Sequence, residues 1–299
     1  MRYAAIDIGS NAVRLLIADI IDSGKETFFK KNTLIRVPLR LGDDAFIDKK
    51  ISSQKSEELL KTMTAFKHLL DVYKVSDYRA CATSAMREAS NGAELVKRIK
   101  EEAGINLEIV EGQSEANIIY SSHIEQTLER KKNYLYIDVG GGSTELSVFC
   151  DGKVKASKSF PIGTVRMLDN ADTDESWAEI KEWIRVNSKL YPNLIGIGTG
   201  GNINKLFKMS EEKDNMPLSF IKLKEMYNYL NGFSLKERIA VLGLNQDRAD
   251  VIIPACEIYL SVMKWAGVKQ IFVPRVGMVD GIIQLLIEKI KATQKEIKI

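Results

Sequence analysis

The sequence has few of the residues that build zinc sites and disulfide frameworks. It contains three cysteines and two histidines in 299 residues. The cysteines, Cys81, Cys150 and Cys256, are widely spaced and form no Cys-x-x-Cys pair, which favours reduced thiols that serve as packing residues. The histidines, His68 and His123, each stand alone in a helical pattern, so we expect them at the surface. A zinc site of His and Cys is thereby excluded, and oxygen ligands with a hard cation remain as the metal option.

Long apolar runs are also missing. No stretch approaches the roughly 18 apolar residues of a membrane-spanning helix, and the N-terminus enters a strand without the features of a signal peptide. We therefore expect a cytoplasmic protein with no membrane partner. The net charge of +3 suits a polyanionic ligand but lacks the strong positive bias of nucleic-acid binders, so no nucleic acid partner is expected. With 45% hydrophobic and 28% charged residues, the chain has the composition and length of two globular domains.

What the sequence does contain is a repeated segment. Residues 3–17, YAAIDIGSNAVRLLI, return 131 positions later as residues 134–148, YLYIDVGGGSTELSV. In each copy an apolar strand ends in Asp-x-Gly, a small polar turn follows and a second apolar stretch leaves the turn, which predicts a β-hairpin. A single Asp-x-Gly after a strand is usually only a turn, whereas two copies at a constant offset indicate two related halves.

The two turns carry the groups that phosphate binding needs. Glycine lets backbone N–H groups approach phosphate oxygens, hydroxyl groups add donors, and an Asp can hold a divalent cation. For Asp7 and Asp138 the alternative is an Asx turn that caps its own loop, and for Glu145 it is a surface position. We expect phosphate-binding groups at Ser10, Asn11, Gly140, Gly141, Gly142 and Ser143, and metal ligands at Asp7, Asp138 and Glu145.

The remaining periodicity predicts alternating strands and helices. Strands are expected within 26–41, which holds one or two, and at 78–82, 107–110, 153–160, 194–197 and 270–273. Helices are expected at 52–74, 91–102, from about 115 to about 129, and at 174–190, 223–230, 235–242, 249–266 and 282–297. Asn91 is expected to cap the second helix, and a turn is expected at 277–281. No low-complexity linker separates the halves, so we expect them to meet along a cleft near Glu115 and Gly281.

Together these motifs resemble the exopolyphosphatase/guanosine pentaphosphate phosphohydrolase (Ppx/GppA) family, a branch of the acetate kinase, sugar kinase, Hsp70 and actin superfamily. The matching stretches cover nearly the whole chain, at 7–15, 82–87, 111–116, 138–146, 163–166 and 198–201. The chain resembles the short form of the family, which implies an α/β fold of two ribonuclease-H-like (actin-like ATPase) domains with an interdomain active-site cleft.

The resemblance also implies an activity. It is the removal of terminal phosphate from inorganic polyphosphate or guanosine pentaphosphate with Mg²⁺, with Mn²⁺ as a second option. We assign the domains to residues 1–115 plus 282–299 and to residues 116–281. The oligomeric state is left open, with a homodimer as one option.

Hydrolysis of a phosphoanhydride needs an oriented water and charge neutralisation. The resemblance puts the water-activating carboxylate at Glu115, which opens a predicted helix, so Glu115 is the expected general base, with Glu111 a weaker candidate. The alternative role for Glu115 is to complement the helix dipole. Arg87 is expected to offer a fork-shaped cation to phosphate oxygens. Gly200 and Gly201 lie where superfamily kinases bind adenosine, so they either contact a nucleotide or remote phosphate or form only a tight turn.

The chain departs from the family pattern at two positions of interest. Ala12 stands where Ser is usual, and Val279 stands where Arg is frequent. These departures keep open a non-catalytic sensor that binds guanosine tetra- or pentaphosphate. The same glycine turns are also compatible with a superfamily kinase that phosphorylates a small acceptor with ATP. Basic residues such as Lys31 and Arg40 are candidates for a polyphosphate track, with solvated surface positions as the alternative.

Overall fold

The computed structural model describes residues 1–24, 26–121, 129, 132–274 and 276–297, with only the backbone of 113, 116, 119, 120 and 292–297. The chain forms two compact units. Unit 1 is Met1–His123 with Val276–Ile299, and unit 2 is Ile124–Arg275. Unit 2 is therefore inserted into the sequence of unit 1. Among the residues that the structure describes, no helix combines the length and the apolar character needed to cross a membrane.

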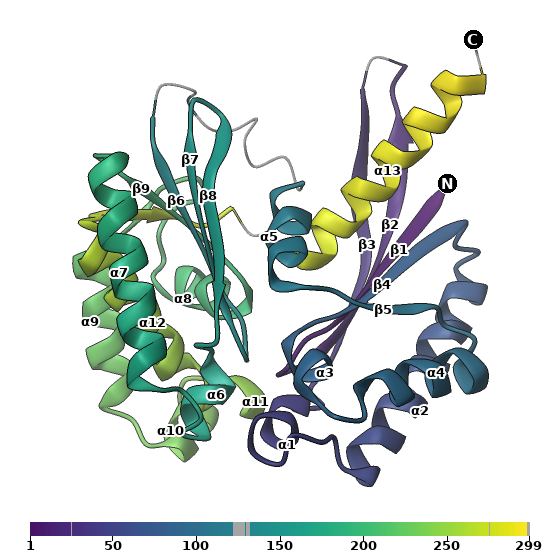
Figure 1. Ribbon diagram of the computed structural model, residues 1–299, viewed down its shortest axis with the longest axis horizontal. Helices are drawn as coiled ribbons and strands as arrows, with labels where there is room; N and C mark the ends of the chain where they lie inside the picture. The colour runs from purple at the N-terminus through teal and green to yellow at the C-terminus, as the bar shows by residue number, and fades with distance from the viewer. Residues whose placement is uncertain (25, 122–128, 130–131, 275, 298–299) are drawn as a thin grey trace. The chain divides into compact units, whose positions relative to one another are not determined.

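Unit 1 is an α/β layer structure around a mixed sheet (Figure 1). Its described strands form a five-stranded sheet in the order β3-β2-β1-β4-β5, in which β1 pairs antiparallel with β2 and parallel with β4. The elements are β1 (Arg2–Ile8), β2 (Val13–Asp22), β3 (Thr27–Val37), α1 (Leu41–Ile47), α2 (Ser53–Val72), β4 (Asp77–Ala82), α3 (Ser84–Glu88), α4 (Gly92–Ala103), β5 (Leu107–Ile109), α5 (Gly112–Tyr120) and α13 (Met278–Ile297).

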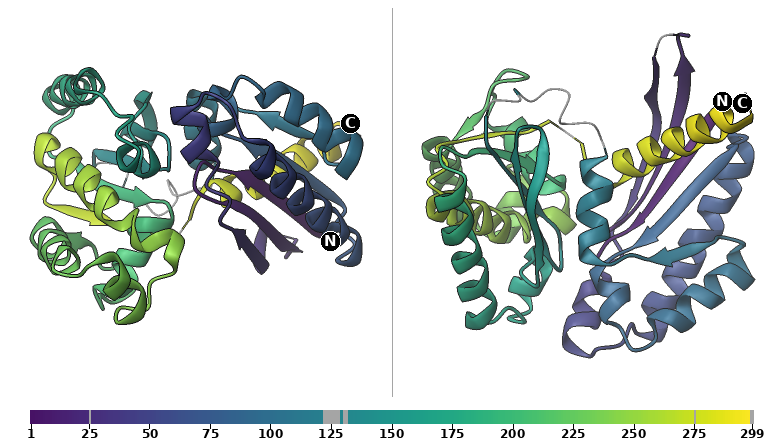
Figure 2. Two further views of the ribbon diagram at one scale, coloured as in Figure 1. Left: turned by 90° about the horizontal axis from the view of Figure 1, so that it is seen from below. Right: turned by 45° about the horizontal axis from the view of Figure 1, so that its top comes forward.

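The central strand of unit 1 explains why both faces of this sheet are covered. Strand β1 is apolar apart from Arg2 and Asp7, and all of its residues after Arg2 are buried. Helix α13 lies against β1, β2 and β4, and it also packs on α5. Helices α2 and α4 pack together on the opposite face of the sheet, as the two views of Figure 2 show. A strand buried on both sides in this way reads as a continuous apolar run rather than as an alternating pattern.

Unit 2 repeats the same topology with additions. Its described strands form a six-stranded sheet in the order β10-β11-β9-β6-β7-β8, so β8-β7-β6-β9-β11 corresponds to β3-β2-β1-β4-β5 of unit 1. The elements are β6 (Tyr134–Val139), β7 (Thr144–Cys150), β8 (Lys153–Phe160), α6 (Thr164–Leu168), α7 (Asp174–Leu190), β9 (Ile195–Thr199), α8 (Gly201–Met209), β10 (Leu218–Ser219), α9 (Phe220–Asn231), α10 (Leu235–Ala240), α11 (Gln246–Ala249), α12 (Ile252–Ala266) and β11 (Gln270–Phe272). The fold is α/β with two ribonuclease-H-like domains, as predicted.

The core of unit 2 lies between its sheet and a helical layer in which α12 packs against α7 and α9 (Figure 1). Helix α12 has apolar residues on all its sides, which is typical of a buried helix. Tyr259 of α12 is fully buried within this cluster. Cys256 is buried there as a free thiol, which confirms its predicted packing role. Cys81 is likewise buried and free in unit 1, and His68 is exposed as predicted, while His123 lies outside the described residues.

Two predictions near helix starts were wrong. Residues 277–281 do not form a turn, because α13 begins at Met278. The carboxylate of Asp280 accepts a hydrogen bond from the Gly277 N–H at 3.0 Å, which starts the helix earlier than its apolar pattern suggests. Asn91 precedes α4 but makes no side-chain cap. Its amide instead bonds the backbone N–H and C=O of Ile51, because those two groups lie within reach once the fold forms.

Two predicted helices have different bounds in the structure. Helix α5 ends at Tyr120, and Glu129 is not helical, while residues 122–128 of the predicted helix lie outside the described residues. The helix predicted over 249–266 is interrupted, so that α11 ends at Ala249 and α12 begins at Ile252. The short helices α1, α3 and α6 were not predicted, because five to seven residues carry too little periodic signal.

Candidate functional site

The two predicted hairpins have the same turn. In unit 1 the N–H of Gly9 donates to the carbonyl oxygen of Ala12 at 3.2 Å. In unit 2 the N–H of Gly140 donates to the carbonyl oxygen of Ser143 at 2.9 Å. The last paired residues also correspond, since Ile8 faces Val13 in unit 1 and Val139 faces Thr144 in unit 2. The sequence repeat is therefore a repeat of three-dimensional structure.

In unit 2 the carbonyl groups of the turn are bonded to the start of α6. The N–H of Thr164 donates to the oxygen of Gly140 at 3.0 Å, and the N–H of Val165 donates to that of Gly141 at 2.8 Å. The Nε of Arg166 donates to the oxygen of Gly142 at 2.9 Å, which completes three consecutive anchored carbonyl groups. The side chain of Arg166 is thus a buried anchor of the turn.

This anchoring determines which way the turn presents its amide groups. In a trans peptide the C=O and the N–H of the next residue point in opposite directions. Because three carbonyl groups face α6, the N–H groups of Gly141, Gly142 and Ser143 face away from it. Successive N–H groups on one side of a turn form a concave nest that binds anions. The three N–H groups are therefore available to an anion on the side away from α6, and phosphate binding by Gly140, Gly141, Gly142 and Ser143 stays a prediction.

The close contact between α6 and the turn depends on a glycine. A Cβ at Gly163 would lie 2.4 Å from the carbonyl oxygen of Gly141 and 2.5 Å from the carbonyl carbons of Gly141 and Gly142. Backbone atoms cannot give way as a flexible side chain can. Only glycine lets the preceding strand and α6 approach the turn at this point.

In unit 1 the start of α1 holds the first turn in a similar way. The N–H of Gly42 donates to the oxygen of Ser10 at 2.8 Å, and the N–H of Arg40 donates to the oxygen of Asn11 at 3.0 Å. The side chain of Ser10 is buried and its hydroxyl lies 2.9 Å from the hydroxyl of Ser84, at the start of α3. By the same peptide geometry, the N–H groups of Asn11 and Ala12 face away from α1.

The charged residues that flank the two turns differ. In unit 1, Asp7 lies opposite Arg14 across the hairpin, and their side chains form a 2.6 Å ion pair. At the corresponding positions of unit 2, Asp138 lies opposite Glu145. Two carboxylates that face each other on adjacent strands repel one another. Unit 2 therefore has two facing carboxylates at the position where unit 1 has an ion pair.

The surroundings of the two carboxylates in unit 2 are largely buried. Glu145 is only 2% exposed and accepts a 2.8 Å hydrogen bond from the hydroxyl of Ser159, which rules out the alternative of a surface position. Gly200 lies against Asp138, since a Cβ at Gly200 would be 2.9 Å from a carboxylate oxygen of Asp138, and its φ of 103° favours glycine. Gly200 is thus brought to the hairpin of Asp138 and Glu145, although it lies far from both in the sequence.

A buried tyrosine that the sequence analysis did not single out also belongs to this group. The hydroxyl of Tyr259 donates to the backbone oxygen of Thr199, the residue before Gly200, at 2.6 Å. Burial raises the pKa of Tyr259 well above its ordinary value, and the nearby charges of Asp138 and Glu145 raise the pKa further. The phenol is therefore a neutral donor. Its only sequence signal was a hydroxyl inside an otherwise apolar helix, which is more typical of the core.

The remaining predicted residues are in unit 1. Glu115 lies in the first turn of α5, where its N–H bonds the oxygen of Glu111 at 2.9 Å. Arg87, at the end of α3, donates from Nη1 to the carbonyl oxygen of Val110 at 2.7 Å, so its side chain is held at the residue that follows β5. Burial raises the pKa of Asp7, while the Arg14 guanidinium lowers it. The predicted active-site cleft between the two domains stays a prediction.

The carboxylates of unit 2 suit some metal ions and not others. Within the described parts of the chain, no group of three or more His, Cys, Asp or Glu side chains is placed to hold a metal. Asp138 and Glu145 offer two carboxylates, which fits Mg²⁺, because Mg²⁺ commonly binds one or two carboxylates and takes its other oxygens from water and phosphate. It does not fit a metal that demands a complete cage of protein ligands.

Comparison with known proteins identifies the family. The model of the Ppx/GppA phosphatase family matches residues 20–289. The chain is 28% identical over 287 residues to the bifunctional 3-dehydroquinate synthase/phosphatase of Fusobacterium nucleatum, covering 88% of this chain and 43% of that protein, less than half its length. It is 22% identical over 304 residues to exopolyphosphatase 1 of Mycobacterium tuberculosis, covering 95% and 87% of the two chains.

A solved structure shares the fold. The crystal structure of an exopolyphosphatase from Cytophaga hutchinsonii matches with a TM-score of 0.84 at 23% identity, covering 97% of this chain and 98% of that chain. The family match extends over most of both units, and it includes the glycine turn with Asp138 and Glu145. The chain belongs to the Ppx/GppA phosphatase family.

Proposed function

We propose that this protein is a Mg²⁺-dependent phosphohydrolase that releases terminal phosphate from inorganic polyphosphate, guanosine pentaphosphate or both. The observation that carries the proposal is the pair of facing carboxylates, Asp138 and Glu145, beside a turn whose amides form an anion nest. Carboxylates and an anion site repel each other unless a cation lies between them. Membership of a phosphatase family and the match to an exopolyphosphatase support the choice of reaction and substrate.

Asp138 and Glu145 are the residues that would hold the metal. When bound, Mg²⁺ neutralises phosphate charge and withdraws electrons from the bond that breaks. Ser159 fixes the orientation of the Glu145 carboxylate through its hydrogen bond. Because residue 200 is a glycine, its backbone lies close to Asp138 and limits the movement of the Asp138 carboxylate on that side. The N–H groups of Gly141 and Gly142 then bind phosphate oxygens, and they need little rearrangement because α6 already holds their peptides.

We assign the general base to Glu115, following the family resemblance. In this role the carboxylate accepts a proton from the attacking water while the water oxygen bonds to phosphorus and the terminal phosphoanhydride bond breaks. Arg87 is assigned to the transferred phosphate, because its tether at Val110 leaves the rest of the guanidinium fork for a second interaction. Ser10 and Asn11, in the turn of the first hairpin, are assigned to phosphate binding. Asp7 is a weaker candidate for the metal, since it must first give up its ion pair with Arg14.

The test is phosphate release from long-chain polyphosphate, guanosine pentaphosphate and ATP, each with Mg²⁺, with Mn²⁺ and with chelator. We expect release from one or both of the first two, dependent on the metal, and a loss of at least 100-fold in Glu115→Gln and in Asp138→Asn. Glu179→Gln is the matched control, because Glu179 lies on helix α7 and forms a surface ion pair with Lys158. Binding of guanosine pentaphosphate without turnover would support the sensor instead, and phosphorylation of an acceptor by ATP would support the kinase.

A further inference from the structure

A row of polar side chains crosses the sheet of unit 2 at the level of the two carboxylates. Asp138 of β6 pairs with Glu145 of β7 on one side and with Thr199 of β9 on the other. Glu145 in turn pairs with Ser159 of β8. Residues that pair directly on neighbouring strands have their side chains on the same face of the sheet. Thr199 is therefore the neighbour of Asp138 on that face, in a row that ends at Ser159.

This face is the one that lies away from the helical layer of the unit. Ile137 and Val139 belong to the core between the sheet and α12. Because side chains alternate along a strand, Asp138 lies on the opposite face, and Thr199 shares that face. On the core side, the hydroxyl of Tyr259 donates to the backbone oxygen of Thr199 at 2.6 Å. The backbone of Thr199 is thus held from one face of the sheet, while its side chain lies on the other.

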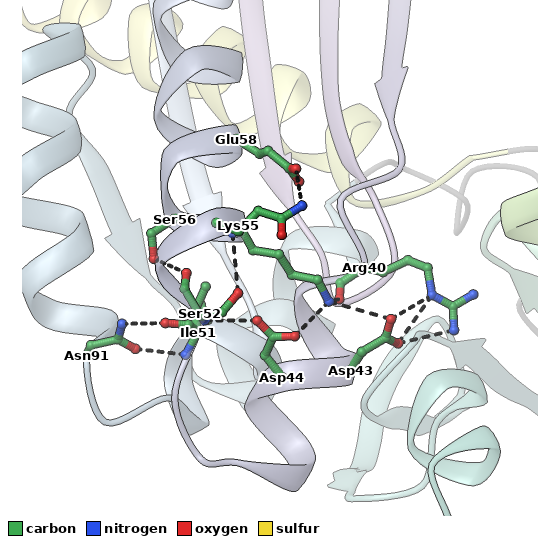
Figure 3. Close-up of polar contacts among 10 residues, drawn as sticks. Arg40, Asp43, Asp44, Ile51, Ser52, Lys55, Ser56, Glu58 and Asn91 are labelled. Atoms are coloured by element: carbon green, nitrogen blue, oxygen red, sulfur yellow. Dashed lines mark hydrogen bonds and ion pairs between the residues drawn. The ribbon is translucent and has the colours of Figure 1, made fainter.

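The hydroxyl of Thr199 lacks a hydrogen bond in a place where one is expected. Thr199 is fully buried, and within the described residues its hydroxyl oxygen has no hydrogen-bond partner. Other buried hydroxyls are bonded, such as that of Ser56, which donates to the carbonyl oxygen of Ser52 at 2.7 Å at the start of α2 (Figure 3). Leaving a buried polar group unpaired costs free energy. An unpaired hydroxyl beside a candidate metal ligand therefore indicates a partner that comes from solution.

Thr164 shares this feature but not this place. It is buried, and its hydroxyl also has no partner among the residues that the structure describes. However, Thr164 starts α6, which packs against α12 and holds the carbonyl side of the glycine turn. The row that contains Asp138 does not include it. Thr199 is the residue whose unpaired hydroxyl lies on the same face as the carboxylates.

The corresponding row of unit 1 carries different groups. There Asp7 pairs with Cys81 of β4 and with Arg14 of β2, and Arg14 pairs with Arg36 of β3. Hard cations such as Mg²⁺ take oxygen ligands. The row of unit 2 has an oxygen-bearing side chain at each position, where unit 1 has a thiol and two guanidinium groups beside its aspartate. Thr199 is the counterpart of Cys81, and it adds an oxygen next to the two carboxylates.

We propose that Thr199 is a positioning residue of the cation site, whose hydroxyl accepts a hydrogen bond from a water molecule bound to the cation that Asp138 and Glu145 hold. Mg²⁺ usually keeps several of its waters in protein sites, and these waters need acceptors. Neighbouring strands lie about 4.8 Å apart, so one water can bridge groups that extend from the same row. The inference rests on the proposed function, because it needs a cation at these carboxylates.

The decisive variant is Thr199→Val, which replaces the hydroxyl with a methyl group. Because the hydroxyl has no partner among the described residues, the chelator-treated variant should melt no lower than the unmodified protein. Its affinity for Mn²⁺, titrated calorimetrically in the presence of inorganic phosphate, should fall about tenfold. The rise in melting temperature on addition of Mg²⁺ should shrink accordingly. Thr199→Ser keeps the hydroxyl and should bind Mn²⁺ nearly as the unmodified protein does.

Thr62→Val is the matched control for this change. Thr62 is also buried, but its hydroxyl donates to the carbonyl oxygen of Glu58 at 2.7 Å within α2. The same exchange of a hydroxyl for a methyl group is made there in the other unit. It should leave the affinity for Mn²⁺ and the stabilisation by Mg²⁺ unchanged.

Two results would overturn the inference. One is a Thr199→Val variant that binds Mn²⁺ as tightly as the unmodified protein. The other is a Thr199→Val variant that melts lower or fails to fold in chelator, which would show that the hydroxyl serves the structure. If the unmodified protein still releases phosphate, the proposed function stands and only the role of Thr199 falls. If the unmodified protein neither binds the cation nor releases phosphate, both are refuted.

Discussion

Asp138 faces Glu145 at the register position where Asp7 faces Arg14 in the other unit. The two hairpins share their strand pairing and their turn hydrogen bond, but the residue that faces the aspartate has the opposite charge. The unit with the ion pair satisfies its own aspartate. We expect the unit with two carboxylates to bind a cation, and this difference leads to a reciprocal experiment.

Glu145→Arg should convert the second hairpin into a copy of the first. The new side chain is expected to pair with Asp138 as Arg14 pairs with Asp7. Because this neutralises the carboxylate pair, added Mg²⁺ should no longer raise the melting temperature, and phosphate release should be lost. Thermal unfolding with and without Mg²⁺ measures the first effect. A variant that keeps its stabilisation by Mg²⁺ would show that the metal binds elsewhere.

Arg14→Glu is the reciprocal change and should be destabilising. Asp7 is buried, and loss of its partner leaves an uncompensated charge, which costs about 3 kcal/mol. Urea unfolding at neutral pH measures the loss. We expect Mg²⁺ to restore part of it, because the variant hairpin presents two facing carboxylates. Stability equal to that of the unmodified protein would contradict the view that the ion pair neutralises Asp7.

Gly163→Ala should separate α6 from the second turn. The added Cβ meets the backbone of Gly141 at 2.4 Å, so the segment must move away, at a cost of about 1–3 kcal/mol. Phosphate affinity should fall with stability, since the anchored peptides no longer hold the amide nest in place. Gly277→Ala is the control, because a Cβ there has nothing within 4 Å. Calorimetry with phosphate and a melting curve distinguish the two glycines.

Tyr259→Phe should loosen the support of Gly200 without opening a large cavity. The phenol is the donor to the Thr199 carbonyl, so its removal leaves a buried acceptor and costs about 1–3 kcal/mol. If Tyr259 positions the metal ligand, kcat should fall and the Mg²⁺ concentration for half-maximal activity should rise. The KM for the phosphate chain should change little. Tyr227→Phe is the control, because it removes a similar bond, 2.9 Å to Glu257, at a different place. A Tyr259→Phe enzyme with an unaltered Mg²⁺ requirement would assign Tyr259 to stability alone.

Cys256 should make the protein less stable in alkali. Burial raises the pKa of this thiol from 9.0 to about 12. Between these values the unfolded chain loses the proton that the folded protein keeps, so the contribution is complete below pH 9 and declines as the pH rises towards 12. At about one pH unit above 9 the loss amounts to about 1.4 kcal/mol. Urea unfolding from pH 8 to 11 should show a shallower decline in Cys256→Ala, and parallel curves would refute this origin.

The sequence predicted the fold well where the signal is periodic and long. Helix α7 has the predicted bounds, and both hairpins lie where the repeated segment indicates. The predictions failed where contacts between distant segments decide. Asn91 looked like a cap because it precedes a helix, but the backbone of Ile51 competes for its amide. No local pattern contains that competitor.

The candidate site was predictable in part for the same reason. Asp138, Glu145 and the glycine turn are adjacent in a hairpin, so a short segment specifies them. Tyr259 and Gly163 could not be recognised, because their roles arise only when α12 and α6 reach the turn region. The difference between Arg14 and Glu145 was visible in the repeat, but its meaning depends on the cross-strand register that the structure supplies.

The insertion of unit 2 within unit 1 has a consequence for biosynthesis. Unit 1 needs α13 to cover β1, β2 and β4, and α13 is synthesised after the whole of unit 2. A Cβ at Gly281 would lie 1.8 Å from the oxygen of Ile118, so the late helix must dock very closely on a segment made much earlier. During synthesis, unit 2 can therefore complete its contacts before α13 is available, so the sheet of unit 1 stays uncovered on that face until α13 has been made.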